Sequence, residues 1–301
     1  MSSSSPANVT CPASPVPDFC NTIVTNPDIS GIGIRVAIYV QTLINMVVAS
    51  WLHENEKAFR DTSRNSFTIS GGLIISSLIT WKTRGLSLFD ALIVSMLTTI
   101  STAFVSVNFP YIRTLGLSIN VASLVFTAFW CYWGLQIWSS PSTFGLPPDI
   151  ANCSANKDTK FVAFVTVSPL NPGLRGFALF IFAIGVIPAL GSLRYSIVWL
   201  LRYWRTGSEI AKDNAAYRFA KEMRRKRKTH ITRFGGLTGL IYMIVTTEVM
   251  IARNVSTKEA LSKWSYGQFI AMAMLGQQIL DSFLYLKQLV NEKHRRLAQH
   301  R

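Results

Sequence analysis

Met223-Arg224-Arg225-Lys226-Arg227-Lys228 forms the centre of a basic stretch, 202–234, that lies between two long apolar segments. Ten of the thirty Lys and Arg residues of the chain lie between Arg205 and Arg233. Short loops rich in Lys and Arg stay on the cytoplasmic side of a membrane because they are difficult to translocate. The stretch therefore predicts a basic cytoplasmic loop, 203–235, and with it the orientation of the apolar segments on either side.

The composition outside this stretch is that of a membrane protein. Of the 301 residues, 49% are hydrophobic and 15% are charged, and apolar runs of about 17 to 26 residues recur along the chain. The formal net charge is +15, but the positive residues gather beside the apolar runs. Their expected partners are therefore anionic lipid headgroups rather than nucleic acid. The composition predicts an all-α, polytopic transmembrane bundle.

Seven segments have the composition of membrane-spanning helices: about 31–52, 66–82, 87–109, 114–138, 174–202, 236–253 and 265–289. They predict a seven-helix transmembrane domain over 31–289, preceded by a flexible tail, 1–30, and followed by a basic tail, 290–301. The second segment is short and contains Gly71-Gly72.

The Lys and Arg residues are unequally divided between the two sides. With the N-terminus outside, the inner segments 53–66, 110–113, 203–235 and 287–301 hold 19 of them, and the outer segments 1–30, 82–86, 139–173 and 253–264 hold 7. This asymmetry predicts an extracellular N-terminus and a cytoplasmic C-terminus. Arg224, Arg225, Lys226, Arg227 and Lys228 are then the residues expected to contact lipid or a cytoplasmic signalling protein.

The N-terminal tail has features of an extracellular segment. It contains no Lys or Arg, a glycosylation sequon at Asn8-Val9-Thr10, and two cysteines, Cys11 and Cys20, that are spaced to close a small disulfide loop. Two further sequons begin at Asn152 and Asn254, both in segments expected outside. Together these features predict a glycoprotein of the plasma membrane or another secretory-pathway membrane. Cys131, within the fourth span, is expected to stay reduced.

The largest predicted external loop, 139–173, is rich in Pro and Gly and contains the apolar run 161–167. Either a short strand or hairpin, or an unstructured loop, suits this composition. Trp130, Trp133 and Trp138 lie toward the outer end of the fourth span, where an interfacial aromatic belt is the expected role and a ligand-stacking wall the alternative.

Ionisable side chains inside the spans are few, and each is costly unless it is paired or hydrated. At 1.5 Å of rise per residue, Arg35, Asp90 and Glu248 lie about 5 to 7 Å from the outer ends of three different spans. This common depth predicts an outer polar site in which Glu248 or Asp90 neutralises Arg35. Such a site holds helices together, or lines a ligand-filled or water-filled cavity; snorkelling of Arg35 is the third interpretation.

A second polar group is expected deeper in the membrane. Asp281 and Arg194 lie at similar estimated depths, within reach of each other given the long Arg side chain. Gln277, Asp281, Tyr285 and Gln288 share one face of the seventh span, and this face is expected to point into the bundle. The candidate ligand-binding residues are thus Arg35, Asp90, Glu248, Gln277 and Asp281.

Several chemistries have no motif in this sequence. It contains no Walker-type phosphate loop, no HExxH and no G-x-S-x-G. The four histidines, His53, His230, His294 and His300, lie in predicted loops or tails, so neither a metal site nor a cofactor is predicted. Lys287 lies at the end of the seventh span rather than in its middle, unlike the retinal-binding lysine of a rhodopsin.

Asp28-Ile29-Ser30-Gly31-Ile32-Gly33-Ile34-Arg35-Val36-Ala37-Ile38-Tyr39-Val40-Gln41-Thr42 resembles the opening of the first span in uncharacterised multi-pass membrane proteins of filamentous fungi. In that group, a G-x-G-[IV]-R-x-A-x-Y-x-Q-like run follows an acidic turn. The rest of the chain resembles the group in span layout only. The resemblance implies a helical plasma-membrane protein in which Arg35 belongs to a recurring motif, and it implies no activity.

These observations leave three classes of function open. A receptor-like or sensor-like seven-span protein is favoured by the extracellular tail, the outer polar site and the basic loop. An ion channel or transporter is the first alternative, because charges lie at two depths and Gly185, Pro188 and Gly191 predict a bend in the fifth span. An intramembrane enzyme using buried carboxylates is the second, although the estimated depths of Glu248 and Asp281 differ by roughly 15 Å.

Overall fold

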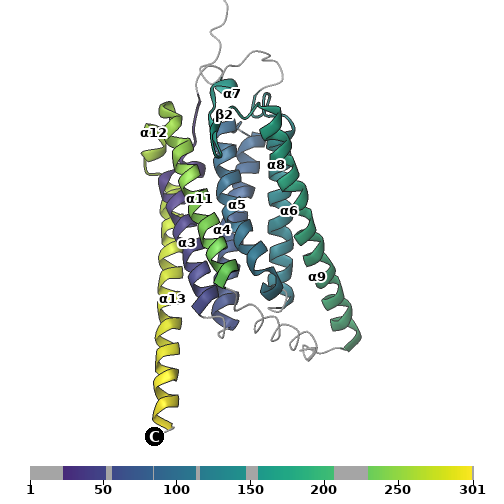
Figure 1. The fold of residues 1–301 in the computed structure, drawn as a ribbon, viewed down its shortest axis with the longest axis vertical. Coiled ribbons are helices and arrows are strands. Elements are labelled where there is room, and N and C mark those ends of the chain that lie inside the picture. The colour runs from purple at the N-terminus through teal and green to yellow at the C-terminus, as the bar shows by residue number, and fades with distance from the viewer. Residues whose placement is uncertain are drawn as a thin grey trace, which may run out of the picture.

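The chain forms a bundle of long helices with a small hairpin at one end (Figure 1). A computed structural model describes residues 23–51, 56–83, 85–112, 116–146, 155–206 and 230–299. The long helices are α3 (Ile32–Trp51), α4 (Glu56–Thr83), α5 (Leu88–Ile112), α6 (Leu117–Ser139), α8 (Pro172–Ile184), α9 (Val186–Thr206), α11 (His230–Arg253) and α13 (Tyr266–Gln299). The short elements are α2 (Pro27–Ser30), α7 (Ala155–Asp158), β1 (Phe161–Val162), β2 (Thr166–Val167) and α12 (Val255–Ser262). The end of the bundle that carries α7, α12 and the hairpin is called the hairpin end below.

The predicted all-α bundle is confirmed. Each of the seven predicted spans falls on a long helix, with α8 and α9 together forming the fifth. Six segments of the described chain are long and apolar enough to cross a membrane: Pro27–Met46, Leu88–Asn108, Leu117–Ser139, Pro172–Leu201, Gly235–Arg253 and Tyr266–Gln288. The structure therefore has the helices that an integral membrane protein requires.

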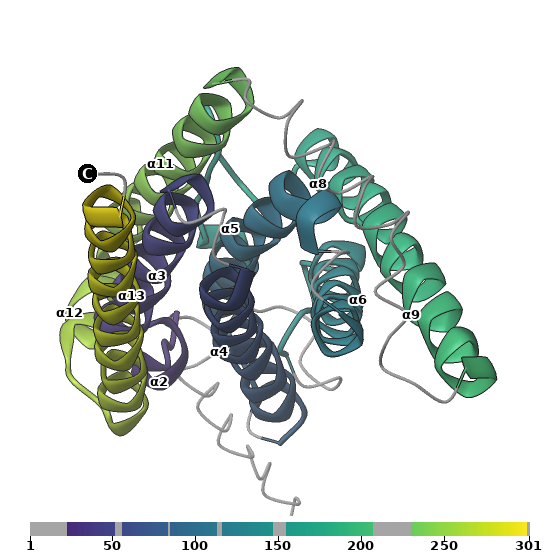
Figure 2. The same ribbon diagram turned by 90° about the horizontal axis from the view of Figure 1, so that it is seen from below.

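The helix that is missing from these six is α4, which begins ten residues before the predicted second span. It packs against α3, α5 and α6 (Figure 2). Its buried face carries the hydroxyls of Ser63, Ser66, Ser70 and Ser77, and the Ser70 hydroxyl lies 2.6 Å from that of Ser101 in α5. Neighbouring helices cover this face, whereas Ile75 and Ile79 on the other side of α4 are 43% and 57% exposed, so α4 turns its hydroxyl-bearing face into the bundle and an apolar face outward.

Helix α5 lies at the centre of the hydrophobic core, and its Phe89, Leu92, Ile93 and Leu97 are fully buried. The three tryptophans of α6 also lie inside the bundle, so the expected interfacial belt is wrong for them. Their rings contact aromatic residues of three other elements: Trp130 packs on Phe182, Trp133 on Trp81 and Trp138 on Phe161, with centroid distances of 4.5, 6.5 and 5.5 Å. These three rings pack between protein elements and do not face lipid.

The fifth span breaks at Gly185, between α8 and α9. A Cβ at this position would lie 2.2 Å from the ring of Trp130, so only glycine allows α6 to approach here. Pro188 falls in the first turn of α9, where its missing N–H has no intrahelical partner to lose. The fifth span is thus interrupted near the predicted position, at Gly185, where Trp130 approaches closely.

The predicted external loop contains the hairpin, in which Phe161 pairs with Val167 and Val162 with Thr166. Asn254 holds its base: the side chain accepts a hydrogen bond from Lys160 N–H (3.0 Å) and donates one to Lys160 O (2.9 Å). Asn254 is buried and its amide nitrogen also bonds Met250 O at 2.7 Å. The Asn254 side chain, to which a glycan would be attached at this sequon, is thus engaged in hydrogen bonds within the protein.

Other predictions fall on residues outside the described ranges. These are the disulfide between Cys11 and Cys20, the sequons at Asn8 and Asn152, and the basic residues 224–228. Cys131 of α6 is a buried free thiol.

Candidate functional site

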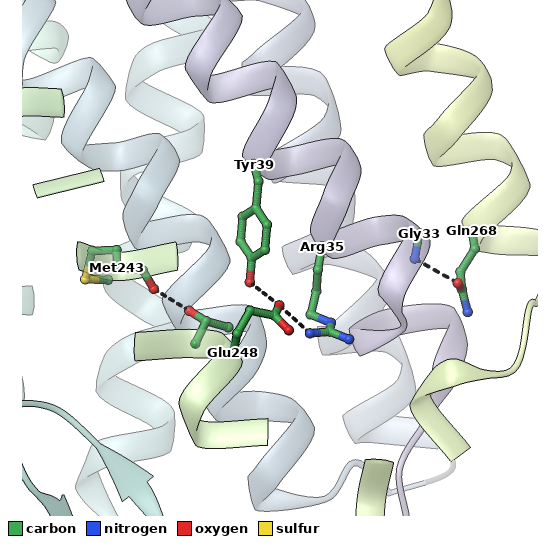
Figure 3. Close-up of polar contacts among 7 residues, drawn as sticks. Gly33, Arg35, Tyr39, Met243, Glu248 and Gln268 are labelled. Carbon is green, nitrogen blue, oxygen red and sulfur yellow. Dashed lines mark hydrogen bonds and ion pairs between the residues drawn. The ribbon is translucent and has the colours of Figure 1, made fainter. Parts of the chain in front are cut away.

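Arg35 of α3 forms an ion pair with Glu248 of α11 at the hairpin end (Figure 3). The Arg35 Nη1–H donates to Glu248 Oε1, and the Tyr39 hydroxyl, one turn further along α3, donates to the same oxygen at 2.9 Å. The Arg35 side chain is 5% exposed and that of Glu248 is 47% exposed. The expected pairing of Arg35 with Glu248 is confirmed. Of the two charged groups, the Arg35 guanidinium is the buried one.

Asp90 belongs to a different cluster. Its backbone N–H donates to Ser87 Oγ (3.1 Å), which makes Ser87 the N-cap of α5. Its carboxylate accepts hydrogen bonds from the Ser30 hydroxyl, the Asn26 N–H (2.8 Å) and the Ser87 hydroxyl (3.0 Å). Asp90 therefore ties the segment before α3 to the start of α5. The expectation that Asp90 shares one site with Arg35 is wrong, because equal depth does not determine the direction in which each helix turns its side chain.

The start of α13 packs on the start of α3 through Gln268, a residue that was not among the predicted site residues. Gly33 N–H donates to Gln268 Oε1 at 2.8 Å (Figure 3), and Gln268 Nε2 donates to Pro27 O (3.1 Å) and Lys263 O (2.8 Å). A Cβ on Gly33 would lie 2.8 Å from the Gln268 Cβ. The paired glycines of the motif were the available signal, because such glycines often mark the close approach of a neighbour.

The motif 28–42 is thus a junction between helices. Asp28 accepts a hydrogen bond from the Gly267 N–H (3.1 Å) at the start of α13. Ser30 bonds Asp90 of α5, and Arg35 and Tyr39 bond Glu248 of α11. Three helices that are distant in sequence are therefore held by one stretch of fifteen residues.

A cavity of about 880 Å³ opens beside this junction at the hairpin end. Its lining comes from three segments of chain: residues 23–27 up to the start of α2, 80–82 and 85–90 between α4 and α5, and 144–146, Ala155, Asn156 and Thr159 after α6. Trp81 stacks on Phe144 with ring centroids 5.2 Å apart, which gives the cavity an aromatic wall.

Two charged residues of the described chain line this cavity, Asp90 and Lys82. The Asp90 carboxylate is buried and already accepts three hydrogen bonds. Lys82 is exposed, and its Nζ lies 4.1 Å from the centre of the Trp81 ring, without a carboxylate partner among the described residues. The lining therefore offers an apolar aromatic surface and one available ammonium group.

The predicted polar face of α13 is one position out of phase. Gln277 and Gln288 are exposed, whereas the side of α13 that packs on α3 carries Gln268, Leu275 and Gln278 as buried residues. Gln277 therefore does not point into the bundle as expected. Gln268, Leu275 and Gln278 are seven and three residues apart, whereas the predicted face runs from Gln277 in steps of four, four and three, and Gln277 lies about 100° around the helix from Gln278.

Asp281 does not pair with Arg194. Arg194 is exposed on α9, and α9 and α13 lie on opposite flanks of the bundle (Figure 2). Further along α13, Asp61 of α4 makes a contact that was not predicted: its Oδ2 accepts a hydrogen bond from the Tyr285 hydroxyl at 2.7 Å. Depth matching failed here for the same reason as at Asp90.

A polar seam joins α13, α3 and α4 inside the bundle. Gln278 Nε2 donates to Asn45 Oδ1 at 2.8 Å, and the Asn45 amide donates to the Ser66 hydroxyl. Gln41 Nε2, Ser63 Oγ and Gln278 Oε1 are buried and make no hydrogen bond within the described chain. Unpaired polar atoms in a membrane interior are costly, so this seam has the chemistry of a hydration site.

The described residues contain no cluster of three His, Cys, Asp or Glu side chains that could hold a metal ion. The chain matches no protein-family model, and neither a curated protein nor a solved structure is found to be similar to it.

Proposed function

We propose that this chain is a receptor-like or sensor-like membrane protein with seven spans, whose ligand enters the cavity at the hairpin end. The cavity carries this proposal, because a volume of about 880 Å³ lies within the range of small-molecule sites. The Lys and Arg asymmetry of 19 to 7 supports an extracellular hairpin end and a cytoplasmic 203–235 loop. The packing of α4 against α3, α5 and α6 supports a seventh crossing.

The construction of the cavity supports a sensing role. Asn26 lines the cavity and donates its N–H to Asp90, and Ser30 holds the same carboxylate from the next turn. Residues that continue this segment bond α11 and α13. A ligand that changes the position of residues 23–27 would therefore act on three helices at once, which is the differential contact that a switch between two states requires.

The lining defines the ligand class. The Trp81 and Phe144 rings favour an aromatic or apolar body, and the Lys82 ammonium favours a negative group. The proposed ligand is a small aromatic carboxylate or a molecule of equivalent chemistry. The 203–235 loop is the proposed contact for a cytoplasmic signalling protein. The proposed location is the plasma membrane or another secretory-pathway membrane, and the resemblance of the motif to membrane proteins of filamentous fungi supports it.

Thermal unfolding of the full chain in lipid nanodiscs, in the presence of a panel of small aromatic carboxylates, tests the proposal. At least one compound is expected to raise Tm, and Lys82→Ala is expected to abolish that shift. Lys258→Ala, which removes an exposed lysine of α12 outside the cavity, is the matched control and should keep the shift. No stabilising compound, or an equal shift in Lys82→Ala, would contradict the proposal.

A channel or transporter is the second candidate, favoured by the polar seam of α3, α4 and α13. Its unpaired groups Gln41, Ser63 and Gln278 are sites that water would complete. Ion or proton flux into liposomes that depends on Gln278, with loss in Gln278→Leu, would favour this function over the first. No observation favours an intramembrane enzyme, because Glu248 is held by Arg35 and Tyr39.

A further inference from the structure

The outward face of α13 has the pattern of a second helix-packing surface. Ile270, Ala273, Gln277, Leu280 and Leu284 follow one another in steps of three and four residues, and all five are exposed. We call these five residues the outer seam. The positions through which α13 packs on α3 have the same spacing on the opposite side of the helix. Alternating steps of three and four keep a face in register with a neighbouring helix over several turns.

We propose that the outer seam pairs with the same seam of a second copy of this chain within the membrane, with Gln277 hydrogen-bonded to its symmetry mate. The helix lies at the flank of the bundle (Figure 2), and α3 is its principal neighbour. Ile270, Leu280 and Leu284 are 45%, 65% and 55% exposed. The apolar residues of the outer seam would pack equally well against lipid or against another helix. Gln277 is therefore the residue that distinguishes these two surroundings.

Gln277 lies near the middle of the membrane. It is eleven residues from Tyr266, where the apolar segment of α13 begins, which places it about 16 Å into a hydrocarbon layer of roughly 30 Å. Its exposed amide makes no hydrogen bond to any described residue. Lipid chains offer neither a donor nor an acceptor, so an amide that faces them carries a desolvation cost.

A second copy of the chain removes this cost. A carboxamide has both a donor and an acceptor, so two of them facing each other form reciprocal hydrogen bonds. In a dimer whose two-fold axis is parallel to the membrane normal, Gln277 meets Gln277 at the same depth by symmetry. Ala273 is one turn away, and a Cβ added at Gly276 would meet no atom within 4 Å, so the backbones have room to approach closely.

Cysteine cross-linking of the full chain in membranes tests this arrangement. Leu284→Cys lies on the outer seam, and Phe283→Cys, its neighbour in sequence, lies about 100° around the helix with a similar exposure of 63%. Under mild oxidation, Leu284→Cys is expected to give a linked dimer in which mass spectrometry identifies the 284–284 disulfide. Phe283→Cys is expected to give little. Equal cross-linking of the two variants would overturn the proposal that the outer seam is the contact between two copies.

Energy transfer between donor-labelled and acceptor-labelled chains in phosphatidylcholine vesicles tests the role of Gln277. Gln277→Leu is expected to weaken association about three- to thirtyfold, the factor expected for an interhelical hydrogen bond in a membrane. Gln277→Asn retains an amide and should keep most of the association, whereas Met274→Leu, off the seam, should have no effect. Gln277→Leu should also leave the Tm of the monomer in detergent unchanged. Association that is unaltered in Gln277→Leu would overturn the proposal.

Discussion

At the scale of single residues, the two partners of the Arg35–Glu248 ion pair differ in how deeply they are buried. Arg35 is 5% exposed and its Nε makes no hydrogen bond, whereas half of the Glu248 side chain is open. Removing one partner of a buried pair is costly because it leaves the other charge without compensation. The cost therefore depends on which partner remains.

We predict that Glu248→Ala destabilises the protein more than Arg35→Ala does. Glu248→Ala leaves a buried guanidinium unpaired and is expected to cost ~3 kcal/mol. Arg35→Ala leaves a carboxylate that water or headgroups can reach, at ~1 kcal/mol. Unfolding of both variants in detergent measures the difference. The double variant Arg35→Leu/Glu248→Leu should recover much of the loss; equal costs for the two single variants would show that burial of Arg35 is not what decides stability here.

A second residue-scale prediction concerns Gly33. In Gly33→Ala the new methyl would meet the Gln268 Cβ at 2.8 Å, so α13 must move. Overpacking of this kind is expected to cost ~2 kcal/mol. Gly239→Ala in α11 is the matched control, because no atom lies within 4 Å of its Cβ position and alanine favours a helix. A thermal scan in detergent should show a lower Tm for Gly33→Ala only; the same Tm in both variants would remove the steric explanation of the motif.

At the scale of elements, Asn254 attaches the hairpin to α11. Asn254→Ala removes three hydrogen bonds, to Lys160 N–H, Lys160 O and Met250 O. It is expected to cost about 1–3 kcal/mol and to increase amide exchange in 160–167 more than elsewhere. Because the amide nitrogen is buried and bonded, glycopeptide analysis should find Asn254 without a glycan. A glycan at Asn254 would mean that the hairpin is not held as described.

The positions of the helices could be predicted from the sequence, whereas the rotation of each helix about its axis could not. Helix positions were predictable because apolar runs of membrane length have few other folds available. The Arg35–Glu248 pair was among the expected contacts because both side chains lie at one depth. Asp90 and Asp281 were at matching depths too, and the structure separates them from their expected partners. Depth follows from counting residues, whereas rotation depends on packing between helices, which one sequence does not contain.

At the scale of the whole molecule, the crossing of α4 decides the topology. If α4 spans the membrane, Gly85 and residues 52–55 lie on opposite sides. An epitope inserted at Gly85 should be labelled in intact cells, whereas epitopes at 53–55 and near Lys226 should need permeabilisation. Labelling at Lys226 without permeabilisation, together with an N-terminal tail that needs permeabilisation, would invert the orientation. Absence of labelling at Gly85, together with labelling of the N-terminal tail, would leave six spans.

The length of α13 has a mechanical consequence. Its 34 residues extend beyond the rest of the bundle (Figure 1), and a straight helix of this length measures about 51 Å. Gln268 and the Asp28 carboxylate hold one end, close to the cavity, and Gln278 and Tyr285 bond α3 and α4 further along. The fourteen residues beyond Tyr285 measure about 21 Å, so a tilt of about 5° at Tyr285 displaces the far end by ~2 Å. This last part of α13 therefore has the geometry of a lever arm, in which a small rotation at the bundle becomes a larger displacement at the free end.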